Sequence, residues 1–413
     1  MDSVSESDTP MPSVHLFEPR DLSTYGPLTL MRSVAELRAG VFTNLKRAKL
    51  TTQAGINGLW VRPVIAEDLK SRHPELRINE SIPANGILFH TGLMATVYPS
   101  LINALRDVAR GKITWQGTVV AAKPGQELSF NANAIDALDQ LPEVDIPLTD
   151  LPLVTRIWEL LDHHPSLLIH DLRYWQGGTR RPDTPPDVAM INASEIHLHQ
   201  SVQLSQFIHL DASTGPIVLD ADVKLFPFTS LTGPLYVGPG SQVRSHCRLT
   251  GSSISRGCNV GGEIKNVIMH AFSNKVHDGY LGDSILGSWV NLGANTNSSN
   301  LKNNYQPIRL LWEGQTFPTG RQFLGALVGD HTKTAIGTRL NTGTAIGAFA
   351  NIFHTGFPPR FLPSFSWGDG TYKLERALET VRRVLARRQQ DLPPSTDALI
   401  RTLAADPAPF MHW

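Results

Sequence analysis

The sequence predicts an α/β domain followed by a parallel β-helix. The main observation is a period of six in the second half of the chain, which is typical of hexapeptide repeats and fits neither an α-helix nor a lone amphipathic strand. Two unbroken runs carry it: Leu219, Leu225, Leu231, Val237, Val243 and Leu249, then Val328, Thr334, Leu340, Ile346 and Ile352. Aliphatic-glycine pairs agree, since Leu-Gly, Val-Gly and Ile-Gly are absent before residue 230 and occur nine times from Val237-Gly238 to Ile346-Gly347.

The first part of the chain, residues 1–175, mixes helical and strand patterns and is expected to form the α/β domain. Ser33 and Glu36 make a capping-box signature, which predicts a helix from there to about Lys49. A second helix is expected over 151–161. The apolar runs GILFH (86–90) and GTVVAA (117–122) are expected to be strands.

A polar stretch rich in proline and glycine predicts a linker over 176–189. The β-helix is expected over 190–370, with glycine and small residues at its tight corners. The period fails between about 295 and 321, so a loop is expected to leave the coil there. A helix with mostly late basic residues is expected from 372 to 390, within a C-terminal region of 371–413.

Composition narrows the function classes. The chain has 413 residues, 41% of them hydrophobic, with 37 basic and 37 acidic side chains, which argues against nucleic-acid or acidic-membrane partners. No apolar run of about 20 residues and no basic-then-apolar leader are seen, so we expect a cytoplasmic protein without a membrane span. Cys247 and Cys258 lack metal-ligand spacing, and no metal ligands are predicted from them.

Six long motifs then carry a family resemblance: PLTLMRSVAELRAG (27–40), GGEIKNVIM (261–269), SNKVHDGYLGD (273–283), NLGANTNSSNLKNNY (291–305), GDHTKTAI (329–336) and FPPRFLPSFSWG (357–368). They resemble a divergent branch of GlmU-like sugar nucleotidyltransferases. That branch is related to the bifunctional glucosamine-1-phosphate acetyltransferase and N-acetylglucosamine-1-phosphate uridyltransferase. The resemblance covers most of the chain and implies a nucleotidyltransferase-like N-terminal domain, a left-handed β-helix and a homotrimer.

The resemblance also implies an activity: acetyl-CoA-dependent N-acetylation of an amino sugar 1-phosphate in the β-helix. Nucleotidyl transfer from UTP or another nucleoside triphosphate, with Mg²⁺, would then give a UDP-sugar such as UDP-N-acetylglucosamine. His277 matches the family's catalytic base, and Lys265, Tyr280, Asn291 and Asn300 match its sugar-phosphate ligands.

Two family positions depart from the pattern. The upstream arginine falls at Cys247, with Arg248 close by, and the later lysine falls at Gln306, with Lys302 close by. Ala294 and Ala326 are expected near the acetyl-CoA. Because eighteen residues make one coil of three six-residue faces, Asn295 is expected one coil beyond His277.

The chemistry also follows from residue types. Histidine titrates near neutral pH and can take the proton of an attacking amine, lysine suits a phosphate, and amides give directional contacts. Structural roles remain open: a corner histidine for His277 and an amide ladder for the asparagines. Lys275 and Lys333 either cover the surface or meet a phosphate. His331 is either a second site histidine or a corner residue.

The N-terminal domain lacks the glycine-rich loop that cradles nucleotide phosphates after the first strand. Arg32 and Asn79 are the candidate nucleotide-binding residues there, and local capping or pairing is the alternative for Arg32. Two other functions stay open. One is a sugar-1-phosphate nucleotidyltransferase whose β-helix only assembles the trimer, and the other is a non-catalytic module that binds sugar nucleotides.

Overall fold

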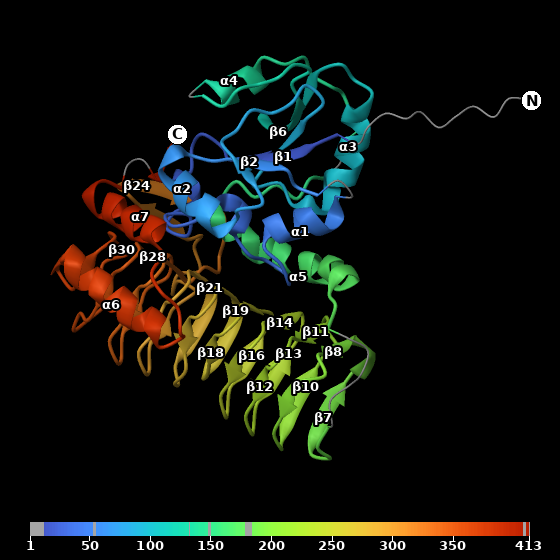
Figure 1. The fold of residues 1–413 in the computed structure, drawn as a ribbon. Helices are drawn as coiled ribbons and strands as arrows, with labels where there is room; N and C mark the ends of the chain where they lie inside the picture. Colours follow the sequence, from blue (N-terminus) through green and yellow to red (C-terminus); the bar gives the residue numbers. More distant parts are fainter. Residues whose placement is uncertain are drawn as a thin grey trace, which may run out of the picture. The chain divides into compact units, whose positions relative to one another are not determined.

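The computed structural model describes residues 12–52, 55–131, 133–147, 150–177, 184–407 and 410–412. Residues 1–11 and residues 178–183 of the linker expected over 176–189 lie outside these ranges. The chain forms two compact units (Figure 1). The first runs to Arg20 and resumes over Asn44–Leu153, and the second combines Asp21–Thr43 with Val154–His412. This division differs from the expected boundary near 175, since two N-terminal segments pack with the β-helix.

The first unit is built on a six-stranded sheet in the order β3-β2-β1-β4-β6-β5. The neighbouring strands β1, β2, β3 and β4 run parallel, whereas β6 is antiparallel to both β4 and β5. The strands are β1 (Val14–Phe17), β2 (Gly58–Trp60), β3 (Arg77–Ile78), β4 (Ile87–His90), β5 (Gly111–Trp115) and β6 (Thr118–Lys123). Its helices are α1 (Asn44–Thr51), α2 (Pro63–Arg72), α3 (Tyr98–Arg106) and α4 (Ala134–Asp139). Strands β1 and β4 are buried along their whole length, as continuous apolar runs in parallel sheets are.

The capping box is present, but the helix predicted after it is wrong. Ser33 and Glu36 exchange the expected hydrogen bonds, yet the turn they cap is a single 3₁₀ turn over Val34–Glu36. Gly40 follows with a φ of +71°, and a Cβ there would lie 2.7 Å from the Asp171 carboxylate. Glycine therefore lets the backbone pass close to a neighbouring helix, and the next α-helix begins only at Asn44.

The second unit contains the β-helix, whose strands pair in parallel from coil to coil to form three faces (Figure 1). The first face has β7 (Val188–Ile191), β10 (Ile208–Asp211), β13 (Ser230–Thr232), β16 (Arg248–Thr250), β22 (Asn297–Ser298) and β27 (Arg339–Leu340). The second has β8 (Ile196–Leu198), β11 (Ile217–Leu219), β14 (Leu235–Val237), β17 (Ser253–Ile254), β25 (Ala326–Val328), β28 (Thr344–Ile346) and β30 (Phe361–Leu362). The long strands β19 (Glu263–Met269) and β21 (Tyr280–Leu286) turn a corner and belong to both faces.

The third face carries short strands, each of which pairs in parallel with the strand of the neighbouring coil. They are β9 (Gln203–Leu204), β12 (Lys224–Leu225), β15 (Gln242–Val243), β18 (Asn259–Val260), β20 (Asn274–Lys275), β26 (Lys333–Thr334), β29 (Asn351–Ile352) and β31 (Ser366–Trp367), the last of which pairs with β32 (Gly370–Thr371). The predicted fold class is confirmed: an α/β domain precedes a hexapeptide-repeat parallel β-helix.

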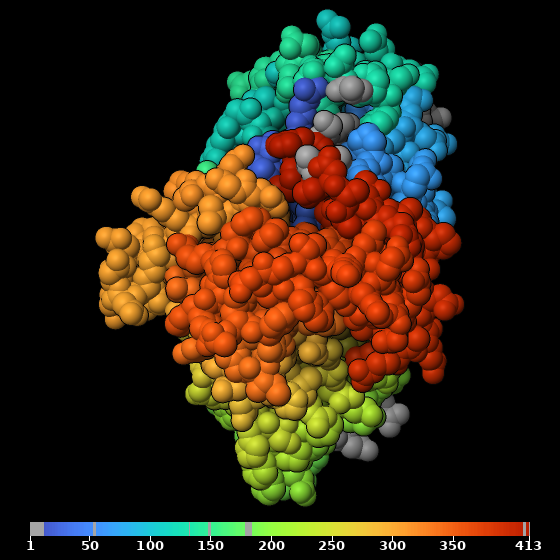
Figure 2. All heavy atoms as spheres, turned by 90° about the vertical axis from the view of Figure 1, so that its left-hand side faces the viewer, coloured from blue at the N-terminus to red at the C-terminus, as the bar shows by residue number. Residues whose placement is uncertain are grey.

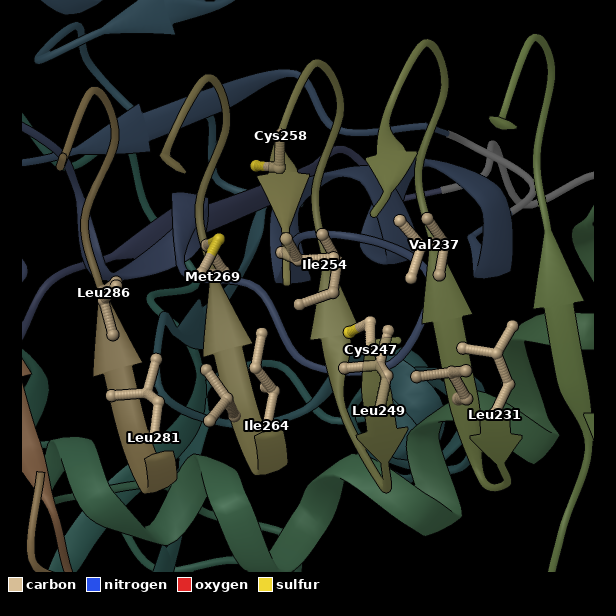
Figure 3. Close-up of a cluster of buried hydrophobic side chains, with 14 of the residues drawn as sticks. Leu231, Val237, Cys247, Leu249, Ile254, Cys258, Ile264, Met269, Leu281 and Leu286 are labelled. Atoms are coloured by element: carbon tan, nitrogen blue, oxygen red, sulfur yellow. The ribbon is translucent and has the colours of Figure 1, made fainter. Parts of the chain in front are cut away.

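The six-residue period marks the interior of the coil. Every residue of the first run is at most 1% exposed, and in the second run Thr334, at 7%, is the most exposed. Side chains from successive coils stack in columns such as Leu231, Leu249, Ile264 and Leu281 (Figure 3). Cys247 and Cys258 are free thiols within this interior. Repeated burial of one aliphatic per face stabilises each coil against its neighbours.

Coil length is not constant, and this changes which residues stack. Leu225 pairs with Val243 eighteen residues on, but Val260 pairs with Lys275 and Leu281 with Ser298, which are closer in sequence. The expectation that Asn295 stacks on His277 is therefore off by one position. The Asn295 N–H donates instead to the carbonyl of Asp278, at 3.0 Å.

The predicted excursion leaves the coil after β22. It contains an antiparallel hairpin of β23 (Arg309–Trp312) and β24 (Gln315–Pro318). The light-orange part of Figure 2 shows this region standing out from the β-helix. Two C-terminal helices follow where one was predicted, α6 (Leu374–Ala386) and α7 (Pro394–Ala405). Within the described ranges, no helix has the length and apolar character needed to cross a lipid bilayer.

Helix α5 (Leu160–Asp171) packs along the second face of the β-helix. Leu168 forms an apolar cluster with Val218, Tyr236 and Val41. The Asp171 carboxylate accepts the N–H groups of Val41 and Phe42. These contacts explain why the segment 21–43 and helix α5 belong to the second unit.

Candidate functional site

A pocket of about 460 Å³ lies on the β-helix beside helix α5. Four of its side chains can hydrogen-bond a ligand and come from the corner of three successive coils: Lys265, Asn266, Asp283 and Asn300. The other lining residues are Leu161, Asp162, Pro165, Pro234, Thr250, Gly251 and Phe323. Its volume suits a small ligand such as a sugar phosphate. Two predicted substrate-binding residues, Lys265 and Asn300, thus line one cavity.

Tyr280 does not line the pocket, but its hydroxyl reaches the lining residue Asn300 because its ring lies across a glycine. A Cβ on Gly282 would sit 2.2 Å from the Tyr280 hydroxyl and 2.6 Å from the carbon that bears it. Only glycine therefore lets the ring reach over the strand. The Tyr280 hydroxyl then accepts a hydrogen bond of 2.9 Å from the Asn300 side-chain amide.

Asp283 organises the amides of the pocket. It is only 7% exposed, and its two oxygens accept from Asn266 at 2.7 Å and from Asn300 at 2.6 Å. A carboxylate only accepts hydrogen bonds, so the side-chain NH₂ groups of Asn266 and Asn300 both point toward Asp283. Both N–H donors of Asn300 are thereby used, on Asp283 and Tyr280. The side-chain oxygen of Asn300 remains as an acceptor for a sugar hydroxyl or ammonium.

The charged residues that line the pocket are one lysine and two aspartates. Burial, together with the charges of Asp283 and Glu263, raises the pKa of the Tyr280 hydroxyl above its usual range, so it keeps its proton and can donate it. Lys265 is exposed at the pocket wall, where its ammonium can meet a phosphate. Asp162, across the pocket on α5, is paired with Arg321.

His277 lies outside this pocket, at the corner between the third and first faces. Its side chain is exposed, three residues before Tyr280 in the bend that leads into β21. The side chain directly before this corner, Lys275, is not at the surface as expected but 1% exposed. Lys333 also departs from a simple surface role, because burial lowers its pKa to about 8.

Asn291 lies on the third face and is not brought to the pocket. Its backbone bridges Asn274 on one side and Lys333 on the other. It thus continues a column of outward polar side chains in which Asn259 donates to Asn274 at 2.8 Å. The structural alternative, an amide ladder, accounts for this position.

The other predicted β-helix residues are dispersed. Arg248 pairs with Glu263 on the neighbouring coil and stays largely exposed. Lys302 lies on the excursion, donates to the Pro307 carbonyl at 2.9 Å and lines other cavities. The Ala294 carbonyl accepts from Gly337. Ala326 is fully buried, with its N–H donating to the Ser284 hydroxyl, so its methyl group faces the coil interior.

Arg32, a candidate nucleotide-binding residue, belongs to the second unit. Its guanidinium is 9% exposed and pairs with the 3% exposed carboxylate of Asp330. It also donates to the Ser288 hydroxyl at 3.2 Å. The ion pair connects the motif around residue 32 with the GDH motif at 329–331. His331 occupies a corner in a stack of rings between Trp289 and Phe349.

In the first unit, Asn79 bonds backbone rather than an open site. Its side chain accepts from the Val61 N–H at 2.8 Å and donates to the Val61 carbonyl at 3.0 Å. Directly after β1, where active nucleotidyltransferases place a glycine-rich loop, stands Glu18. It forms a fully buried ion pair with Arg62, which follows β2. The part of the chain with assigned structure contains no cluster of three metal-ligating side chains.

Sequence reasoning missed Asp283, Asn266 and the contribution of α5. Asp283 stands in the YLGD motif, directly after the residues that were assigned roles, so a signal was present. Asp283 and Asn266 also share a left-handed backbone, with φ values of +45° and +53° at stacked corners, as do other corner residues such as His246 and Trp289. The conformation therefore follows from the corner geometry, and asparagine and aspartate adopt it more readily than most residues.

Comparison with known proteins finds similarity to a nucleotidyltransferase family and to bifunctional transferases. Residues 14–179 match the family described as "Sugar nucleotidyl transferase". A "Bifunctional sugar-1-phosphate nucleotidylyltransferase/acetyltransferase" of Sulfurisphaera tokodaii is 33% identical over 116 residues, 28% of either chain. A "Bifunctional protein GlmU" of Xylella fastidiosa is 26% identical over 205 residues, 44% of this chain and 42% of that one. The chain thus spans less than half the length of these curated relatives.

One solved structure, a "UDP-N-acetylglucosamine acyltransferase", matches 54% of this chain and 92% of its own at 16% identity and a TM-score of 0.21. A score this low carries no argument, and the β-helix rests on its strand pairing. Residues 14–179 are thus similar to the sugar nucleotidyl transferase family, and parts of the chain are similar to two bifunctional proteins, one of them a GlmU.

Proposed function

We propose that this protein is a sugar-phosphate transferase that uses acetyl-CoA to N-acetylate an amino sugar 1-phosphate at the β-helix. The observation that carries the proposal is the network of Tyr280, Asn300 and Asp283 beside Lys265, in a pocket of about 460 Å³. It offers a cation for phosphate, an amide oxygen and a phenol for hydroxyl groups. Two relatives named as bifunctional proteins, one of them explicitly an acetyltransferase, support it.

His277 is the proposed base. It lies three positions before Tyr280, which corresponds to at most about 10 Å of extended chain. A sugar anchored on Tyr280 and Lys265 can therefore direct its amino group toward the His277 corner. The exposed imidazole would take the proton that the amine loses as its nitrogen bonds to the thioester carbon.

The rest of the step follows from the same chemistry. The C–S bond of acetyl-CoA breaks as the tetrahedral intermediate collapses, and the CoA thiolate leaves and takes up a proton. The intermediate's oxyanion requires an N–H donor, for which the backbone around Ala294 is proposed. We also propose a homotrimer, in which a neighbouring copy completes the acetyl-CoA site. The proposal also includes ligand contacts by Asn291, Arg248, Lys302 and Ala326.

Nucleotidyl transfer is a second candidate because residues 14–179 match the sugar nucleotidyl transferase family. It would use UTP or another nucleoside triphosphate, with Mg²⁺, and would involve Asn79 and Arg32. Against it stands the buried Glu18–Arg62 pair after β1, in place of a phosphate-binding loop. Acetyl transfer is therefore the leading proposal, with the N-terminal domain in a binding or architectural role.

The deciding experiment measures thiol release from acetyl-CoA with glucosamine 1-phosphate for wild type, His277→Ala and His246→Ala. His246 is an exposed histidine at the same kind of corner on an earlier coil. Turnover that falls about 10²-fold or more in His277→Ala, and stays near wild type in His246→Ala, supports a general base.

Equal turnover in both variants would reject His277 as the base. If wild type releases no thiol, acetylation of this substrate is rejected. Pyrophosphate release from UTP and a sugar 1-phosphate would then identify the nucleotidyltransferase alternative, and ligand binding without either product would identify a binding module.

A further inference from the structure

Lys275 occupies a position that the repeat otherwise gives to apolar side chains. It follows Val260 in the same interior column, and Leu292 continues that column on the next coil. Only 1% of Lys275 is exposed. An ammonium in such a place destabilises the fold unless each of its donors finds an acceptor.

The three N–H groups of Lys275 find three backbone carbonyls. Its Nζ donates to Gly261 at 3.3 Å, to Asp278 at 3.1 Å and to His277. A lysine ammonium has three donors and no acceptor, so this set satisfies it completely. Two of the three carbonyls belong to the corner that bears His277.

The corner has a reason to need an internal donor. The coil from Val260 to Lys275 is shorter than the eighteen-residue coil from Leu225 to Val243, so its corners are tight. Gly279 has a φ of +118°, and a Cβ there would lie 2.3 Å from the Thr296 carbonyl. Carbonyls turned inward at such a corner would be buried without partners if the ammonium were absent.

We propose that Lys275 is a positioning residue, which holds the 277–279 corner from inside the coil and thereby orients His277 toward the ligand at Tyr280. The inference rests on the role proposed above for His277. It also explains why a lysine persists at an interior position, where an apolar residue would pack without a desolvation cost.

The test compares wild type with Lys275→Met, which has no donor, Lys275→Gln, which has two, and Lys275→Arg. Val243→Ala is the matched control, because it removes volume from the same interior column far from the corner carbonyls. Two readouts are measured on the full-length protein. One is kcat and KM for acetylation of glucosamine 1-phosphate. The other, which needs no turnover, is hydrogen exchange of the 276–281 amides together with the NMR signal of the His277 ring.

For Lys275→Met we expect kcat to fall about 10²-fold, the size of effect produced by a catalytic group misplaced by about 1 Å, while KM changes little. Exchange over 276–281 should be faster and the His277 ring signal should shift. Lys275→Gln and Lys275→Arg should be intermediate, and Val243→Ala should lower thermal stability while leaving kcat and the ring signal as in wild type.

Wild-type kcat, exchange and ring signal in Lys275→Met would overturn the proposal. If that variant does not fold, wild-type values of all three in Lys275→Gln would overturn it instead. Absence of turnover in wild type would reject the proposed function, whereas exchange and the ring signal would still decide whether Lys275 holds the corner.

Discussion

The side-chain amide of Asn300 donates to the hydroxyl of Tyr280 across 2.9 Å, although the two residues lie on different coils. The same amide donates to Asp283, so its carbonyl oxygen is the group left for a ligand. A ligand would therefore meet a hydrogen-bond acceptor, the Asn300 side-chain oxygen, and a donor, the Tyr280 hydroxyl.

Asn300→Asp should therefore damage the pocket more than its small change in shape implies. It replaces a donor by a carboxylate next to the Asp283 carboxylate, and two such groups cannot both stay ionised at this separation without a large cost. We expect KM for glucosamine 1-phosphate to rise about tenfold at pH 8, which corresponds to about 1.4 kcal/mol. Lowering the pH, which lets the pair share a proton, should restore part of the affinity. Asn303→Asp, at an exposed asparagine of the excursion, is the control; equal effects of the two variants would contradict the network.

Lys265→Gln should weaken binding of the phosphorylated sugar by about tenfold, because a partly screened ion pair of this kind contributes about 1 kcal/mol or slightly more. Affinity for unphosphorylated glucosamine should stay the same. Calorimetric titration with both sugars at low and high salt measures this, and the wild-type advantage should shrink as salt rises. Lys373→Gln, an exposed lysine at the start of α6, is the matched control. A similar loss for both sugars would place Lys265 away from the phosphate.

Gly282→Ala should act through Tyr280. The added methyl group would lie 2.2 Å from the tyrosine hydroxyl, so the ring must leave its place over the strand. We expect a rise in KM at least as large as that of Tyr280→Phe, which removes only the hydroxyl. In a Tyr280→Ala background the same glycine change should have little further effect, since the obstructed group is gone. Additive losses in the double variant would show that Gly282 matters for another reason.

Arg32→Met should destabilise the second unit by about 3–5 kcal/mol, because it leaves the Asp330 carboxylate buried without its counter-charge. Replacing both partners, as Arg32→Met with Asp330→Leu, should recover much of this loss. Urea unfolding followed by tryptophan fluorescence gives the comparison. If Arg32 serves a nucleotide alone, the single variant will unfold like wild type and lose only nucleotide affinity.

Lys275 should make the unfolding free energy depend on alkaline pH. Burial lowers its pKa in the folded protein from 10.5 to about 8, against smaller opposing effects of Cys247 and Asp278. Between pH 8 and 10.5 the unfolded chain therefore binds more protons than the folded one, and stability contributed at this site rises with pH. Below pH 8 both states carry the proton and the burial cost is present in full. The unfolding free energy of wild type minus that of Lys275→Met should thus increase from pH 7.5 to 10, and a flat difference would contradict the burial of the charge.

The sequence by itself determined the β-helix and most of its functional motifs. A six-residue aliphatic period leaves one geometry in which every such side chain is buried, and Leu219 to Leu249 are buried as that geometry requires. Local signals also placed β4, β6, the Ser33–Glu36 capping box and the excursion after β22. Motif spacing likewise marked Lys265 and Asn300, which line one pocket, and Tyr280, whose hydroxyl accepts a hydrogen bond from Asn300.

Only the tertiary structure decided what the corners do. When a coil is shorter by one or more residues, different side chains stack on one another, and local sequence propensity does not predict this change. Asn295 therefore pairs with Asp278, rather than His277, on the preceding coil. The preceding coil, from Val260 to Lys275, is shorter still, and Lys275 lies inward beneath the His277 corner. Packing between distant segments decided the rest: Arg32 meets Asp330 and helix α5 closes the pocket, because burial of charge and apolar surface depends on neighbours that the sequence does not place side by side.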